Sequence, residues 1–188
     1  AGVTDIGENR IQEALLKYSA IRNTPYASRI KWHMIGHLQT NKAREAVKLF
    51  DLIHSLDSLR LAEEIDRQAA KINKIQDILI EVNISGEESK FGVNPGELVN
   101  LEKAVSELKN VRLLGLMAMA PAVAESEKVR VYFRKSRELL EKLNARRAAQ
   151  GALRVLSMGM SNDFEAAIAE GAALVRIGRL VFDCVKVL

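Results

Sequence analysis

The chain has 188 residues, enough for one domain with a sizeable hydrophobic core. Its residues are 48% apolar and 28% charged, as in an ordinary globular protein, and no apolar run is long enough to cross a bilayer. The net charge of +4 is dispersed among 28 basic and 24 acidic residues, so we expect no specific nucleic-acid partner and no membrane attachment. The single cysteine, Cys184, has no partner for an internal disulfide, which fits a reducing compartment such as the cytoplasm.

Strand-like and helix-like segments alternate along the whole chain. Seven apolar or β-branched stretches predict strands at Val3–Ile6, Lys31–Ile35, Leu52–Leu56, Asp77–Ile84, Val111–Met119, Val155–Leu156 and Ala173–Ile177. The segments between them predict helices at Arg10–Ile21, Asn41–Phe50, Leu59–Ile72, Gly96–Lys109, Ser126–Gln150 and Phe164–Glu170. Strict alternation predicts right-handed crossovers and a parallel sheet.

The fold class predicted from this order is an α/β fold of the TIM type, a (β/α) barrel. A closed barrel needs eight strands and typically about 250 residues, and only seven strands are predicted. Ala1-Gly2 looks like the end of a helix with Gly2 as its left-handed cap, so we expect the first strand–helix unit to lie before this chain. Residues 1–188 are then a single, N-terminally incomplete barrel domain, and an open doubly wound sheet is the alternative.

Two consecutive strand ends near the C-terminus carry small or cationic residues. The strand Val155–Leu156 runs into the polar corner Ser157–Asp163 and directly into a helix, and the next strand ends at Gly178-Arg179. A helix N-terminus offers free N–H groups, and the last two strand-to-helix corners of a parallel barrel often bind phosphate. Either corner alone is more often an ordinary turn, but the two in tandem favour a phosphorylated ligand.

Arg176 is a cation within an otherwise apolar strand. A buried arginine without an acceptor would cost several kcal/mol, so the side chain needs a partner. One interpretation is a structural salt bridge to a neighbouring carboxylate. The other is a ligand at the mouth of the barrel.

The remaining candidate polar residues favour structural roles. His33 and His37 are four residues apart, but they lie on a strand and the loop after it, so they would not share a face and no metal site is expected. Asp57 is expected to cap the helix that begins at Leu59. Lys90 is a possible anion contact, although a solvated loop lysine is the commoner case. The basic stretch 128–147 is typical of the solvated face of an amphipathic helix, because it has no aromatic stacking set.

Six short segments, spread from one end of the chain to the other, carry a family signature. They are Gly7–Glu13, Trp32–Lys42, Ser89–Gly92, Gly115–Met119, Leu156–Ser161 and Val175–Gly178. In this order they resemble the pyridoxal-phosphate homeostasis proteins, which share the barrel of the N-terminal domain of alanine racemase. Several motifs in register make the resemblance specific.

The resemblance implies a protein that binds pyridoxal 5′-phosphate (PLP) through a lysine imine and buffers the cofactor without established catalytic turnover. It implies that Ser161 and Gly178 hold the phosphate. It also implies that Arg176 faces the pyridine nitrogen and that Asn9 lies near the polar edge of the ring. Ser161 at the head of a predicted helix and a glycine at 178 suit a phosphate. A cation opposite the pyridine nitrogen weakens the ring as an electron sink, which suits a carrier.

The chain departs from the family pattern at two places. The imine lysine of the family lies on the first barrel strand, and Lys31, Lys42 and Lys90 are all elsewhere. We therefore expect this lysine upstream of Ala1 and assign no catalytic residue within the chain. The second departure is Arg179, where the family usually has Thr or Ser. Its guanidinium either strengthens the grip on the phosphate or points outward, and we include it among the cofactor-binding candidates.

Three hypotheses remain. The leading one is a PLP carrier, with PLP-dependent apo-enzymes as candidate recipients of the cofactor. The second is a PLP-dependent amino-acid racemase, which needs acid and base groups on both faces of the substrate carbon. The third is an interaction protein that uses the basic helix 128–147 and keeps the pocket as a relic.

Overall fold

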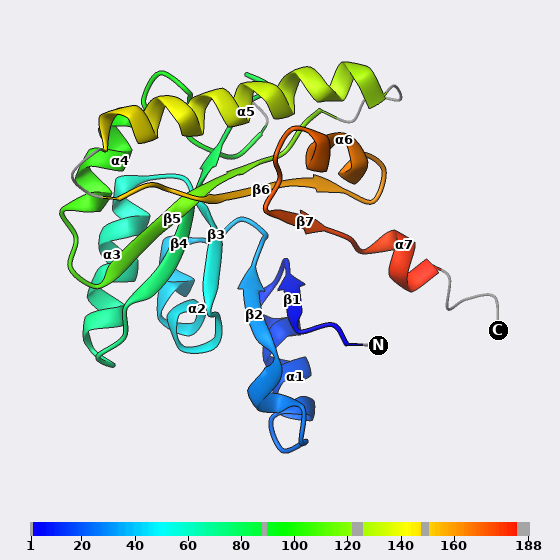
Figure 1. Ribbon diagram of the computed structural model, residues 1–188. Coiled ribbons are helices and arrows are strands. Elements are labelled where there is room, and N and C mark those ends of the chain that lie inside the picture. Colours follow the sequence, from blue (N-terminus) through cyan, green and yellow to red (C-terminus); the bar gives the residue numbers. More distant parts are fainter. Residues whose placement is uncertain (1, 88–89, 122–125, 148–150, 184–188) are drawn as a thin grey trace. The chain divides into compact units, whose positions relative to one another are not determined.

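The computed structural model describes residues 2–87, 90–121, 126–147 and 151–183, and Figure 1 shows their helices and strands. The strands are β1 (Asp5–Glu8), β2 (Lys31–Met34), β3 (Leu52–Leu56), β4 (Gln76–Val82), β5 (Val111–Ala118), β6 (Val155–Met160) and β7 (Leu174–Arg176). The α-helices are α1 (Ile11–Ile21), α2 (Ala43–Leu49), α3 (Leu59–Ala70), α4 (Leu98–Ser106), α5 (Ser126–Arg146), α6 (Phe164–Ala169) and α7 (Arg179–Phe182). Two 3-10 turns, η1 (Ala27–Arg29) and η2 (Thr40–Lys42), precede β2 and α2.

The strands pair in chain order, from β1 to β7, in one sheet. The pairs β1–β2, β2–β3, β3–β4, β5–β6 and β6–β7 are parallel. The predicted alternation and the parallel sheet are therefore confirmed. A doubly wound sheet requires a reversal of the strand order, and the order found here contains none, which speaks against that alternative.

Several predicted boundaries were wrong. The residues from Ser157 to Met160 continue β6 instead of forming a polar corner, and β1 starts at Asp5, two residues later than predicted. The helix predicted to reach Gln150 ends at Arg146; residues 148–150 lie outside the described part of the chain, as does Cys184. The short helix α7 was not predicted.

Two compact units make up the chain, and each is described by itself. The first contains Ala1–Ile80 and Asn100–Leu113, and the second contains Glu81–Val99 and Leu114–Leu188. The single domain expected from the length stays a prediction.

In the first unit, helices pack on strands through apolar side chains at helical spacing. Leu61, Ile65 and Ala69 on α3 are fully buried, as their spacing predicts. Trp32 on β2 is buried and lies edge to face with Tyr18 of α1, at a ring-centroid distance of 5.8 Å. The side chains of β3 are buried along its whole length, as expected for a strand covered on both faces.

The N-cap of α3 differs from the prediction. Ser58 caps the helix, because its hydroxyl accepts a hydrogen bond from Leu61 N at 3.4 Å. Asp57 instead lies beside His37, with 3.3 Å between Asp57 Oδ2 and His37 Nδ1. Serine and aspartate are both common N-cap residues. Here Asp57 is directed to His37, and Ser58 caps the helix.

In the second unit, a buried carboxylate joins α5 to α6. Glu170 is 4% exposed and lies 2.7 Å from Nε of Arg130, and Arg134 and Arg137 each approach it within 3.3 Å. The hydrogen bond from Arg130 holds the pKa of Glu170 below its ordinary value, against the opposing effect of burial. Three of the basic residues of stretch 128–147 therefore have an internal partner.

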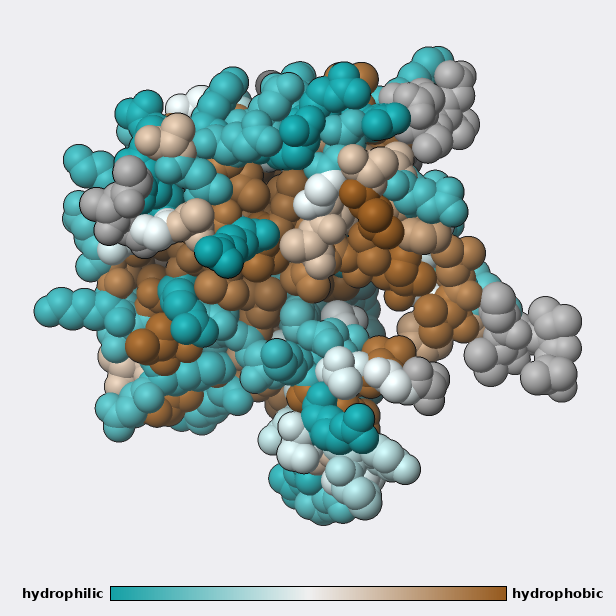
Figure 2. All heavy atoms as spheres, in the orientation of Figure 1, coloured by the Kyte–Doolittle hydropathy of each residue, from teal (hydrophilic) through white to brown (hydrophobic). Residues whose placement is uncertain are grey.

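The outer surface of the second unit is polar on one helix and apolar on another. Figure 2 shows hydrophilic side chains along the exposed face of α5, as expected for a solvated amphipathic helix. It also shows apolar surface at α7, where Leu180, Val181 and Phe182 are at least half exposed. Within the described residues, no helix combines the length and apolar character needed to span a membrane.

Candidate cofactor site

The corner after β6 is a tight turn organised by Asp163. Its carboxylate accepts a hydrogen bond from Met160 N at 2.6 Å, and its own N–H donates to Met160 O at 3.1 Å. Asp163 is the N-cap of α6, a helix of six residues. Ser161 therefore lies two residues before the cap, and the prediction that it stands at the head of the helix was wrong.

Gly159 fixes the path of the chain into this turn. Its φ is +90°, and a Cβ atom built there would lie 2.5 Å from Cβ of Ala167 on α6. Glycine is needed at this position both for the backbone conformation and for the close approach of strand and helix. Ser161 is thus presented by a turn with little freedom to move.

The structure brings Ser161 and Gly178 together. The N–H of Gly178 donates to the hydroxyl of Ser161 at 3.3 Å, across 17 residues of sequence. Gly178 has a φ of −121°, and no atom would lie within 4 Å of a Cβ placed on it. Neither the backbone nor the packing of the described residues requires glycine here. The glycine leaves open space beside two hydrogen-bonding groups.

Arg176 is oriented by two neutral oxygens. One nitrogen of its guanidinium, Nη1, donates to the hydroxyl of Ser157 at 2.8 Å, and Nη2 donates to the carbonyl of Ala118 at 3.2 Å. Burial lowers the pKa of Arg176, and the charges of Glu81 and Asp163 oppose this effect. The side chain is half-buried and stays charged, because an arginine pKa starts far above neutrality. Its two hydrogen bonds fix where that charge points.

The sequence did not reveal the partners of Arg176. Ser157 is fully buried on β6, and Glu81 is a buried carboxylate on β4. The sequence contained a signal for both residues. Glu81 is a glutamate inside an apolar strand, and Ser157 is a serine two residues before Gly159 on the same strand face. Both patterns are unusual in a hydrophobic core. Ala118 contributes its backbone carbonyl, for which the side chain gives no signal.

The other predicted site residues are Arg179, in the second unit, and Asn9, in the first. Arg179, the first residue of α7, follows Gly178 directly and is exposed. Asn9 follows β1 in the first unit and is exposed. A Cβ on Gly36 would come within 2.4 Å of the carbonyl oxygen of Asn9, so the chain segments after β1 and β2 lie in close contact. The role of Asn9 near a cofactor ring stays a prediction.

The histidines have separate partners. His33 Nδ1 lies 2.9 Å from His54 Nε2, and His33 Nε2 lies 3.1 Å from Asp5 Oδ1, so three neighbouring strands are linked. Burial lowers the pKa of His33. His37 is directed to Asp57 instead, in agreement with the prediction that His33 and His37 do not share a face. The described ranges contain no group of three or more side chains placed to hold a metal ion.

Comparison with known proteins connects this geometry to a family. The model of the alanine racemase N-terminal domain matches residues 1–184. A pyridoxal phosphate homeostasis protein of Aquifex aeolicus is 51% identical over 181 residues, covering 96% of this chain and 77% of that protein. A protein of the same name from Pseudomonas aeruginosa is 42% identical over 182 residues, covering 97% of this chain and 75% of that one.

Solved structures give the same result. PipY of Synechococcus elongatus, solved without PLP, is 38% identical with a TM-score of 0.89, and the match covers 96% of this chain and 82% of PipY. PipY with PLP bound gives a TM-score of 0.88 at 37% identity over the same shares of each chain. D-threonine aldolase of Filomicrobium marinum, at 16% identity and a TM-score of 0.76, shares the fold alone. The predicted fold class is therefore confirmed, and the chain belongs to the pyridoxal phosphate homeostasis proteins of the alanine racemase N-terminal domain family.

Proposed function

We propose that this protein binds PLP and carries or buffers the cofactor. The observation that carries the proposal is the contact between Ser161 and Gly178, with open space beside the glycine and Arg176 two residues before it. Support also comes from the relatives, which are named as pyridoxal phosphate homeostasis proteins, and from PipY, whose structure contains PLP.

The residues of this corner fit a phosphate group. The hydroxyl of Ser161 accepts a hydrogen bond from the N–H of Gly178 at 3.3 Å, which leaves its own hydrogen available to donate to a phosphate oxygen. A phosphate monoester, with a charge of roughly −1.5 to −2, accepts such bonds strongly. We place the guanidinium of Arg179, exposed beside Gly178, as a charge-assisted contact to the same group.

Arg176 is proposed to face the pyridine nitrogen of the cofactor. When bound, PLP supplies an aldehyde that reacts with amines and an aromatic ring that withdraws electrons. A fixed cation beside the nitrogen disfavours its protonation and so reduces this withdrawal. The bonds from Arg176 to Ser157 and Ala118 hold the charge in place. Asn9 is proposed to lie near the polar edge of the ring.

The experiment that tests the proposal compares PLP with pyridoxal, which lacks the phosphate. PLP should bind the protein, as followed by absorbance and by mass mapping of the borohydride-reduced adduct. Ser161→Ala should weaken PLP by about tenfold, or about 1.4 kcal/mol, and leave pyridoxal unchanged. Ser28→Ala, a change at an exposed serine in the first unit, is the control and should change neither affinity.

The outcomes separate the function from the site. If the unaltered protein does not bind PLP, the function is wrong. If it binds PLP but Ser161→Ala has no effect, only the phosphate contact is wrong. A reduced adduct on Lys31, Lys42 or Lys90 would contradict the expected position of the attaching lysine.

We expect the protein to have no racemase activity. With PLP bound, the protein should exchange the α-hydrogen of alanine with solvent no faster than PLP free in solution, and sustained racemisation would favour the enzyme hypothesis instead.

PLP-dependent apo-enzymes are the proposed recipients of the cofactor. Mixing the PLP-loaded protein with an apo-aminotransferase should restore transaminase activity. The recovery should be faster than with the same total amount of PLP that dissociates from an unrelated PLP-binding protein. A cytoplasmic location is part of the proposal, and cell fractionation tests it.

A further inference from the structure

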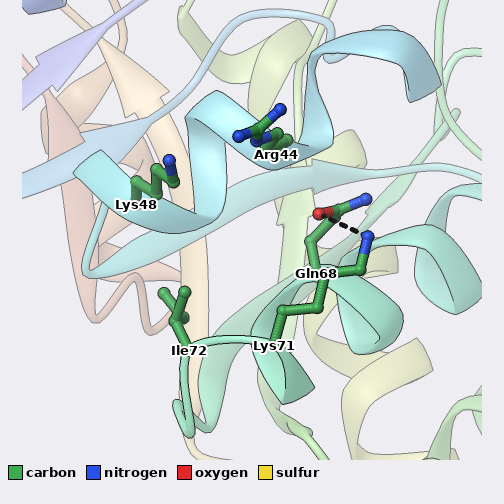
Figure 3. Close-up of a pocket in the computed structure, with 5 residues that line it drawn as sticks. All are labelled: Arg44, Lys48, Gln68, Lys71 and Ile72. Atoms are coloured by element: carbon green, nitrogen blue, oxygen red, sulfur yellow. Dashed lines mark hydrogen bonds between the residues drawn. The ribbon is translucent and has the colours of Figure 1, made fainter.

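A cationic groove lies between α2 and α3 of the first unit. Arg44 and Lys48 of α2 line one side, and Gln68, Lys71 and Ile72, at the end of α3 and just after it, line the other (Figure 3). The cavity has a volume of about 430 Å³. Sites of roughly 300–1,000 Å³ hold small molecules in many proteins. The groove is thus large enough for a small ligand.

The groove collects positive charge without neutralising it. Three of its five lining residues are cations, and none is acidic. Among the described residues, neither Arg44 nor Lys48 has a hydrogen-bond or ion-pair partner. Lys71 donates to the side-chain oxygen of Gln68 at 3.3 Å, which leaves its charge uncompensated at that contact.

The nearest acidic residue on α3 is already engaged. Glu64 accepts hydrogen bonds from Gln68, at 2.6 Å, and from Arg67. These two bonds are the main reason that the pKa of Glu64 is lowered, and the charge of Lys71 has the smallest influence among the causes. Glu64 is therefore engaged mainly by Gln68 and Arg67, and only weakly by Lys71 of the groove.

Packing of the two helices does not require these cations. The faces of α2 and α3 that are buried consist of small and apolar residues, namely Ala43, Ala46, Val47, Leu49, Leu61, Ala62, Ile65 and Ala69. Arg44 and Lys48 are exposed and stand four residues apart, a like-charge spacing that slightly destabilises a helix. A cleft lined by charges of one sign raises the local concentration of ions of the opposite sign, in this case anions.

We propose that this groove binds a small molecule that carries two adjacent phosphate groups. Three cations line the groove, more than a single oxyanion needs, and a diphosphate offers separate oxygens to several cations. The planar guanidinium of an arginine can donate two parallel hydrogen bonds to a phosphate, and the ammonium group of a lysine acts as a compact positive charge. Ile72, which is 43% exposed, offers an apolar wall for the rest of the ligand. None of these residues belongs to the candidate cofactor site, so this inference does not rest on the proposed function.

Calorimetric titration of the protein with inorganic pyrophosphate, at low ionic strength, tests this inference. Pyrophosphate should bind saturably with one site and at least about tenfold more tightly than orthophosphate, because it engages more cations. The double variant Lys48→Gln/Lys71→Gln should weaken this binding by about tenfold or more. The matched control is Lys135→Gln/Lys142→Gln, which removes two exposed charges from α5 and should change the affinity less than about twofold.

Several results would overturn the inference. Equal losses in the two double variants would mean that only the net charge matters. Loss of pyrophosphate binding in Ser161→Ala would place the probe in the cofactor site instead. Binding to RNA or to anionic vesicles, but not to pyrophosphate, would identify the groove as part of a macromolecular surface.

A second measurement keeps the test independent of folding. Without ligand, the Tm of Lys48→Gln/Lys71→Gln should equal or slightly exceed that of the unaltered protein, because like charges are removed. Pyrophosphate should raise the Tm of the unaltered protein and not that of the variant, and Lys48→Arg/Lys71→Arg should restore the effect. A charge-preserving variant that fails to restore it, while still folded, would contradict the inference.

Discussion

At the scale of single residues, a few polar side chains are held in fixed directions by partners on other strands. Arg176 is held by Ser157 and the carbonyl of Ala118, so its charge has one direction. His33 is held between His54 and Asp5 on the neighbouring strands. Such partners matter because a polar group that is removed from water without them destabilises the fold.

His33 gives the first prediction, a dependence of stability on pH. Burial lowers its pKa in the folded state, and Asp5 only partly opposes this effect. Between the folded and unfolded pKa values, the unfolded chain binds more protons. The contribution of His33 is therefore present above the unfolded value of about 6.5 and is lost as the pH falls through the folded pKa.

The measurement is urea unfolding as a function of pH. His33→Asn keeps a polar group near the position of Nδ1 but cannot titrate, so the unfolding free energy should fall less steeply below a pH of about 6.5. Ser28→Ala, which removes no titratable group, should keep the slope of the unaltered protein. If His33→Asn keeps the full slope, another group is responsible.

At the scale of elements, glycines decide how closely strands and helices approach. A Cβ on Gly115 of β5 would lie 1.8 Å from the carbonyl oxygen of Val155 on β6, a contact that no shift of a side chain can relieve. Gly178 is the opposite case, because a Cβ there meets no described atom within 4 Å. The two glycines therefore separate a packing role, at Gly115, from the binding role proposed for Gly178.

The second prediction uses this pair. Gly115→Ala should destabilise the protein by about 3 kcal/mol or more, because two paired strands must move apart, and chemical denaturation measures this loss. Gly178→Ala should keep the stability within about 1 kcal/mol and yet weaken PLP binding, since the methyl group would fill the space proposed for the phosphate. A Gly178→Ala variant that binds PLP normally would argue against the proposed site.

How much of these elements the sequence predicts depends on whether the signal is local. The burial of Leu61, Ile65 and Ala69 follows from their spacing alone, and the structure agrees. The segment from Ser157 to Met160 reads as a turn by composition, but it pairs with β5 at Ser157 and with β7 at Ser157 and Met160, and this pairing makes it a strand.

The candidate site shows the same division. The residues Ser161, Arg176 and Gly178 could be named from motifs that resemble a family. The partner Ala118 of Arg176 could not, because it lies 58 residues away and contributes only its backbone carbonyl. Such a contact exists only once the chain has folded. Similarly, two adjacent capping residues gave no local reason to choose Ser58 over Asp57.

At the scale of the whole molecule, binding and folding are coupled. A ligand that binds only the folded chain stabilises it by an amount that grows with the logarithm of its concentration. The third prediction is that PLP at about 100 times its Kd raises the unfolding free energy by about 2.7 kcal/mol. Calorimetry at several PLP concentrations measures the rise, with Ser161→Ala requiring more PLP for the same shift. A Tm that does not respond to PLP would contradict specific binding to the folded state.

The order of the strands has a consequence for how the protein forms in the cell. Since β1 to β7 pair in the order of the chain, each strand completes its pairing with one that has already been synthesised. Pairing with the preceding strand closes a shorter loop than pairing with a more distant one would, and so costs less loop-closure entropy. We therefore expect the polypeptide to assemble stepwise as it leaves the ribosome, with the residues proposed to hold the phosphate ordered only after β1 to β5 have paired.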